Sequence, residues 1–82
     1  YTITTNDYTV NYTSGTATAT LPTAVGVAGR IYNIKNSGTG VITINTTSSQ
    51  TIDTQVSGYW QLAASSFANI QVQSDGANWI IL

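Results

Sequence analysis

Apolar and polar residues alternate along most of this chain with a period of two. Tyr8, Val10 and Tyr12, for example, alternate with Thr9 and Asn11. Alternation of this kind is typical of β-strands that bury one face, and the 3.6-residue period of an amphipathic helix is nearly absent. The pattern therefore predicts an all-β domain.

The same alternation recurs in further short runs separated by turn residues. A small antiparallel sandwich or prism-like module of about eight strands is expected. The expected strands are Tyr8–Tyr12, Thr16–Leu21, Arg30–Asn36, Val41–Asn45, Thr51–Asp53 (as a short strand or edge segment), Tyr59–Ala63, Phe67–Gln73 and Asn78–Leu82.

Three turn signals predict that neighbouring strands pair as antiparallel hairpins. Thr13-Ser14-Gly15 would join the first two strands, and the Gly-containing loop 36–40 would join the next two. Asp75-Gly76 is the strongest signal and predicts a type I′ turn between the last two strands, because that turn requires positive φ angles.

The segment 22–29 interrupts this alternation of apolar and polar residues. It follows the single Pro and is small, apolar and uncharged, whereas a solvated loop is normally polar. Val25 and Val27 are therefore candidate subunit contacts. The alternative, given equal weight, is a 3₁₀ turn that lies over the core of its own chain.

Uncharged polar residues dominate the composition. Thr, Ser, Asn and Gln account for 35 of the 82 residues, and only 6% of residues are charged, with a net charge of −1. Disorder requires low hydrophobicity and high net charge, but 41% of the residues here are hydrophobic. The composition favours one folded domain spanning residues 1–82, without a linker or a clear internal repeat.

A lone copy of this chain has little stability to spare. Burial of apolar area contributes on the order of 120 kcal/mol, and ordering 82 residues costs roughly the same amount. The chain has no Cys for disulfides and no Cys or His for structural zinc. Oligomerisation is the remaining means of stabilisation, so we expect a homo-oligomer.

Several functional classes are disfavoured by the residues that are missing. His and Cys, the commonest catalytic and metal-binding side chains, are absent, so neither an enzyme nor a cofactor or metal site is expected. The carboxylates Asp7 and Asp75 fit turn positions, which leaves Asp53 without a partner. Two basic residues are too few for nucleic-acid binding, and no apolar run is long enough for membrane insertion.

Tyr59 and Trp60 are the candidate glycan contacts. As neighbours on a strand they point to opposite faces, so one of them is expected in the core and the other outside. An exposed ring among Asn, Gln and Thr side chains suits a sugar, whose apolar face packs on the ring. Packing of both rings against neighbouring strands or subunits is the more favoured interpretation.

An ordered set of segments resembles bacteriophage tail-fibre and related virion proteins. The set runs from Thr20 to Asn36 and continues with Val41-Ile42-Thr43-Ile44, Thr51-Ile52-Asp53 and 74–81. This resemblance implies a trimeric β-rich fibre module, sometimes near the receptor-binding end, and it implies no catalytic residues. Thr54 stands where the family often has Gly, and 55–66 matches poorly.

These observations together predict a structural, trimerising module of a phage tail fibre or similar virion appendage. The chain opens with Tyr1 rather than Met, so we expect a fragment of a longer or processed fibre protein, located in the virion or otherwise outside the cell. The homotrimer is expected from the resemblance alone, because a dimer or an open filament satisfies the physical argument equally well. The alternatives are a lectin-like tip that binds a host cell-surface glycan, and a subunit of a self-assembling extracellular filament.

Overall fold

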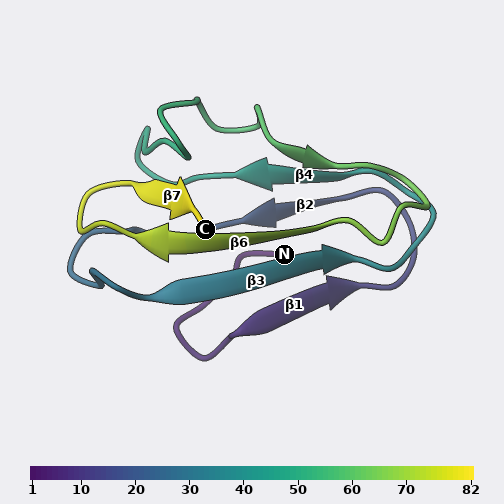
Figure 1. The fold of residues 1–82 in the computed structure, drawn as a ribbon, viewed down its shortest axis with the longest axis horizontal. Helices are drawn as coiled ribbons and strands as arrows, with labels where there is room; N and C mark the ends of the chain where they lie inside the picture. Colours follow the sequence, from purple (N-terminus) through teal and green to yellow (C-terminus); the bar gives the residue numbers. More distant parts are fainter.

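The computed structural model describes all 82 residues and consists of two β-sheets stacked face to face. The seven strands are β1 (Thr9–Tyr12), β2 (Ala17–Thr20), β3 (Ile31–Asn36), β4 (Ile42–Asn45), β5 (Gln61–Leu62), β6 (Asn69–Ser74) and β7 (Trp79–Ile81). One sheet has the order β1-β3-β6-β7 and the other the order β2-β4-β5 (Figure 1). The predicted all-β sandwich is therefore confirmed, with seven strands where about eight were expected.

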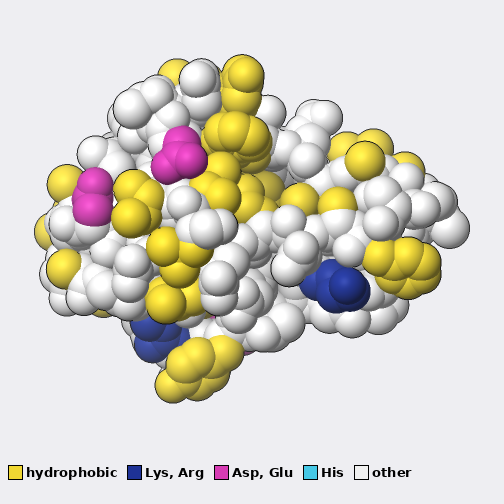
Figure 2. Space-filling model, in the orientation of Figure 1, with side chains coloured by type: hydrophobic (Ala, Val, Ile, Leu, Met, Phe, Trp, Pro, Cys, Tyr) yellow, Lys and Arg dark blue, Asp and Glu magenta, His cyan; other side chains and the backbone are white.

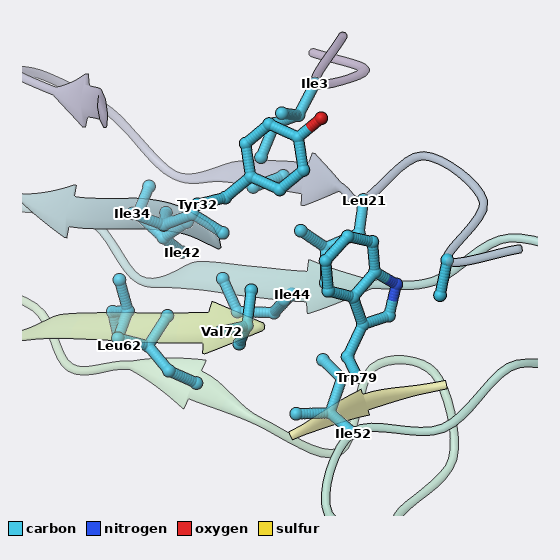
Figure 3. Packing of buried hydrophobic residues seen from close by; sticks show 13 residues of the cluster. Ile3, Leu21, Tyr32, Ile34, Ile42, Ile44, Ile52, Leu62, Val72 and Trp79 are labelled. Carbon is cyan, nitrogen blue, oxygen red and sulfur yellow. The ribbon is translucent and has the colours of Figure 1, made fainter. Parts of the chain in front are cut away.

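The hydrophobic core fills the space between the two sheets. Alternate residues of β3 and β4 are buried, as the period-two pattern requires. Tyr32 and Trp79, the largest fully buried side chains, lie with their ring centroids 5.6 Å apart at an angle of 59°. Isoleucine side chains from both sheets surround them, including Ile34 and Ile44 (Figure 3).

Two of the predicted hairpins are wrong. β1 and β2 lie in different sheets, and so do β3 and β4. Each connection instead crosses from one sheet to the other as an arch. β1 consequently pairs with β3, and β2 with β4, both in parallel. The sandwich therefore consists of two mixed sheets, because stacking one arch on the next places successive strands of each sheet in the same direction.

Close backbone contact between the arches explains why they stack instead of opening into hairpins. The arch 37–41 lies on the arch 13–16. A Cβ atom added to Gly40 would lie 2.3 Å from the carbonyl carbon and oxygen of Gly15. A Cβ atom on Gly38 would lie 2.8 Å from the backbone nitrogen of Ser14. Glycine is required at both positions because another backbone occupies the place of the side chain.

A buried asparagine joins the second arch to the third. Asn36 is fully buried, and its Nδ2 donates to the carbonyl oxygens of Gly40 at 2.7 Å, Leu62 at 3.2 Å and Ala63 at 3.1 Å. Its Oδ1 accepts from the Gly38 backbone N–H at 3.1 Å. Because Nδ2 carries two hydrogens, one of them is shared between two of these oxygens. One side chain therefore binds four backbone groups that the crossings between the sheets would otherwise leave unpaired.

The predicted hairpin at Asp75-Gly76 is confirmed, since β6 and β7 pair antiparallel with Ser74 opposite Trp79. The predicted type I′ turn is wrong, because that type needs positive φ at two successive residues and only Gly76, at 101°, has it. The Asp75 carboxylate accepts hydrogen bonds from the backbone N–H groups of Ala77 and Asn78. These bonds, first of all the one from Asn78, lower the pKa of Asp75.

The remaining segments agree in part with the expected strands. The edge segment 51–53 is confirmed, because Ile52 forms a parallel bridge with Trp79 beside β7. The expected strand 59–63 is reduced to the two residues of β5. Residues 1–3 form a further bridge, between Thr2 and Thr20, along the outer side of β2.

Replacement of Gly40 by Ala is expected to lower the free energy of unfolding by about 3 kcal/mol, because the new methyl group overlaps the Gly15 backbone and the arches must separate. Chemical denaturation measures the loss. Gly15→Ala is the control, since a Cβ there meets open space and only the positive φ of 75° is strained, at about 1 kcal/mol. Equal losses in the two variants would argue against close stacking of the arches.

Replacement of Gly76 by Val is expected to destabilise the protein by about 1 to 3 kcal/mol. A β-branched residue resists the φ of 101°, while the nearest side-chain atom, the Ala28 Cβ at 3.6 Å, leaves room for the substitution. Thermal unfolding checks this prediction, with the exposed neighbour Ala77→Val as control. An unchanged melting temperature for Gly76→Val would contradict the assigned backbone conformation.

Candidate functional site

The structure separates the environments of Tyr59 and Trp60. Tyr59 is exposed, whereas Trp60 is half-buried against the core and its Nε1 donates to the carbonyl oxygen of Ile52 at 2.9 Å. The expected projection of the two rings to opposite faces of a strand is wrong, because both residues precede β5 and their rings contact each other edge to face, with centroids 5.2 Å apart. Tyr59 is therefore the member of the pair that a ligand could reach, and Trp60 mainly fixes the loop that carries it.

Val25 and Val27 lie in the connection between β2 and β3. Val25 is 61% exposed, and Val27 is half-buried. Their neighbour Ala24 is fully buried in the core, and its N–H donates to the Gln50 Oε1 at 2.9 Å. The segment 22–29 thus covers its own core through Ala24 while presenting Val25 to the outside.

The three carboxylates are hydrogen-bonded to backbone groups in separate places. Asp53 Oδ1 accepts from the Ile81 N–H at 3.0 Å, and Asp75 lies in the β6–β7 turn. Asp7 Oδ2 accepts from the Thr4 N–H at 2.9 Å and from the Tyr1 hydroxyl at 2.8 Å. No group of three metal-ligating carboxylates, thiols or imidazoles occurs, and no pocket indents the surface.

A surface that the sequence did not predict lies on the outer side of the four-stranded sheet. The side chains of Asn11 on β1, Asn33 and Lys35 on β3, and Asn69 and Gln71 on β6 point outward, because their neighbours along each strand point into the core. We call these five residues the amide face. In the pairing register Asn33 lies opposite Gln71, and Lys35 lies between Asn11 and Asn69.

The amide groups of this face are free to bind. The side chains of Asn11, Asn33, Asn69 and Gln71 form no hydrogen bond within the chain, whereas the next amide along β6, Gln73, donates to the Gly29 carbonyl oxygen at 3.1 Å. Lys35 makes one long hydrogen bond, from Nζ to the Phe67 carbonyl oxygen at 3.4 Å. An amide has two donor hydrogens and an acceptor oxygen, so this surface offers many unused donors and acceptors side by side.

A basic side chain lies close to an exposed aromatic ring at two places on this side of the molecule. The Arg30 guanidinium lies between the rings of Tyr8 and Tyr32, 4.8 Å from each centroid. Lys35 Nζ lies 5.9 Å from the centroid of Phe67. Figure 2 shows both basic groups in dark blue on this side of the molecule, each beside a yellow group and separated by white polar surface. Tyr8 and Phe67 are 71% and 66% exposed.

Arg30 also fixes the turn that leads into β1. Its Nη2 donates to the carbonyl oxygens of Thr5 and Asp7. The Asp7 carboxylate closes the same turn from the other side through its bonds to Thr4 and Tyr1. These contacts fix the turn that places the Tyr8 ring at the start of β1.

Only part of the amide face can be predicted from the sequence. The alternation in 30–36 and 67–73 predicts which side chains share a face of each strand. It contains no information that these two strands pair with each other, since the expected partner of 30–36 was 41–45. The sequence pattern does not indicate that the chain crosses from one sheet to the other after residues 30–36.

β1 forms the one long margin of the sandwich that nothing in the chain covers. It pairs with β3 on one side and with no strand on the other. The outer side of β7 is covered by 51–53 and that of β2 by 1–3, while β5 has only two residues. No Lys or Pro lies in β1, although these residues commonly prevent pairing at exposed edges.

The turn at Asp7 is expected to weaken in acid. The Thr4 N–H, followed by the Tyr1 hydroxyl, lowers the pKa of Asp7 below its usual value. A carboxyl whose pKa is lower in the folded state stabilises the fold above its unfolded pKa of about 3.9 and loses that contribution as the pH falls further. The difference in unfolding free energy between the parent protein and Asp7→Asn should therefore be constant near pH 7 and shrink below about pH 4. A difference independent of pH would contradict this role.

The structure contains no helix that is long and apolar enough to cross a membrane. Comparisons with protein-family models, curated sequences and solved structures return no match for this chain. The contacts, exposure and charge of the surface residues therefore carry the functional proposal.

Proposed function

We propose that this chain is a structural module that self-associates as a homotrimer within an extracellular fibre of the phage tail-fibre type. The bare edge of β1 is the observation that carries the proposal. The register places the backbone of Tyr8 and Tyr12 toward β3, since their carbonyl oxygens accept from Asn33 and Ser37. The intervening Thr9 and Asn11 then direct their backbone groups away from the sheet, where a strand of another copy can pair with them.

Exposed apolar side chains support the same proposal. In addition to the ring residues described above, Val25, Val56 and Leu82 are each more than half exposed. Repulsion between copies is weak, because the net charge of the whole chain is −1. The number three comes from the resemblance of 20–36 and the later segments to tail-fibre proteins, since the edge alone would equally allow a two-fold pairing.

Light scattering of the purified protein is expected to give a mass of about three times 8.7 kDa. Thr9→Pro should lower this mass, because proline removes the outward N–H while the bonds from β3 to Tyr8 and Tyr12 remain. Thr9→Val keeps the N–H and serves as its control. A monodisperse monomer at micromolar concentration would overturn the proposal, a dimer would overturn the trimer, and a ladder of larger species would favour a filament.

The exposed valine provides an independent test of self-association. Val25→Asp is expected to dissociate the oligomer if the connection between β2 and β3 lies in the interface, because a charge would be desolvated there. Thr39→Asp, which adds the same charge to an exposed position in the arch 37–41, is the control. An unchanged mass for Val25→Asp would remove this segment from the interface and leave the β1 edge as the contact.

A further inference from the structure

The amide face gathers four side-chain amides without hydrogen-bond partners on the outer side of one sheet. These four amides form no hydrogen bond within the chain. On the opposite sheet Gln61 bonds to the Thr43 hydroxyl, and the unpaired outward side chains are the hydroxyls of Thr18 and Thr20 and the single amide of Asn45. In the strand pairing Asn33 and Gln71 stand about 5 Å apart on adjacent strands, and Asn11 and Asn69 flank Lys35 in the next row. Donors and acceptors at that spacing suit a ligand with many hydroxyl groups.

The charged side chains near this surface restrict the kind of ligand that it can bind. Arg30 and Lys35 are the only basic residues of the chain; Lys35 points outward from β3, whereas Arg30 precedes β3 and packs on the buried Tyr32 ring. The outward side chains of β1, β3 and β6 include no carboxylate. The Arg30 guanidinium lies against two rings and beside the Asp7 carboxylate, and its Nη2 bonds to the backbone of Thr5 and Asp7, so Lys35 is the more available cation. A ligand that complements this surface therefore carries anionic groups that are spaced out among neutral hydroxyls.

The exposed rings indicate that the ligand also has apolar faces. Phe67 lies beside Lys35, and Tyr8 lies beside Arg30 at the start of β1. The six residues of β3 span about 20 Å. A pyranose ring has an apolar face that packs on aromatic rings and hydroxyls at its rim that bond to amides. A row of such rings could lie along the strands.

We propose that the amide face binds an acidic polysaccharide of the uronic-acid type. Lys35 pairs with a carboxylate of the ligand, the amides of Asn33, Asn69 and Gln71 bond to its hydroxyls, and the Phe67 ring packs on one sugar. Nucleic acid and polyphosphate fit less well, because a single free lysine can neutralise few phosphates. The site lies within one copy of the chain and does not depend on the proposed trimer.

The test measures binding of the purified protein to polygalacturonate by isothermal titration calorimetry, with dextran as the neutral glycan and polyphosphate as the anion without sugar. Lys35→Gln is expected to weaken polygalacturonate binding about tenfold or more, since it removes a charge-assisted hydrogen bond. Gln71→Ala should weaken it severalfold. Gln61→Ala removes an exposed amide from the opposite sheet and should leave the affinity unchanged. The thermal unfolding of each variant confirms that it is folded.

Binding that weakens in Lys35→Gln and Gln71→Ala but not in Gln61→Ala, and that falls with added salt, supports the proposal. Equal affinity for dextran would overturn the acidic class of ligand, and equal affinity for polyphosphate would overturn recognition of sugar. Absence of binding to polygalacturonate overturns the site. A change of oligomer mass in Lys35→Gln would assign this face to a contact between copies and overturn the proposal as well. The trimer is measured separately by light scattering, so either proposal can fail without the other.

Discussion

The hydrogen bonds of the buried Asn36 side chain are the interaction on which the rest of this fold depends. Every crossing between the two sheets bends the backbone away from the ladders and leaves its N–H and C=O groups without strand partners. Asn36 bonds to one N–H and three carbonyl oxygens, drawn from the arch after β3 and from the end of β5. The Ser65 N–H adds a further bond between these two arches, to the Gly38 carbonyl oxygen at 3.2 Å. The second and third crossings at this end are thereby joined, and the close approach of Gly38 and Gly40 to the arch 13–16 adds the first to the stack.

The stacking of these arches determines which strands are neighbours and therefore which side chains share a surface. Because β1 and β2 separate into different sheets, β3 lies between β1 and β6, and residues distant in the sequence become neighbours. Asn11, Lys35 and Asn69 form one row only for this reason. Had the chain formed the local hairpins, the neighbours of Lys35 would have come from 41–45 and the amide face would not exist.

The sequence predicts the inward and outward faces of this protein better than it predicts the order of its strands. Alternation identified β3 and β6 and their buried residues, because the pleat imposes that period whatever the partner strand. The pairing of β1 with β3 was missed, since loops such as Thr13-Ser14-Gly15 have the length and composition of hairpin turns as well as of arches. The glycines were read as turn formers, although Gly38 and Gly40 are needed for backbone contact between arches. Tyr59 and Trp60 were recognised from their residue type, but the amide face depends on pairing that only the fold provides.

The two sides of the sandwich differ, because the chain reverses its direction at β5 and β6. The first two arches run the same way, whereas β5 and β6 pair antiparallel with β4 and β3 and so end the parallel succession. On the side of β1 no such reversal occurs, so another arch of the same hand could be laid on the first once residues 1–3 left the outer side of β2, where Thr2 bridges Thr20. Lengthening of this architecture by duplication of one arch is therefore tolerated at one side of the stack and resisted at the other.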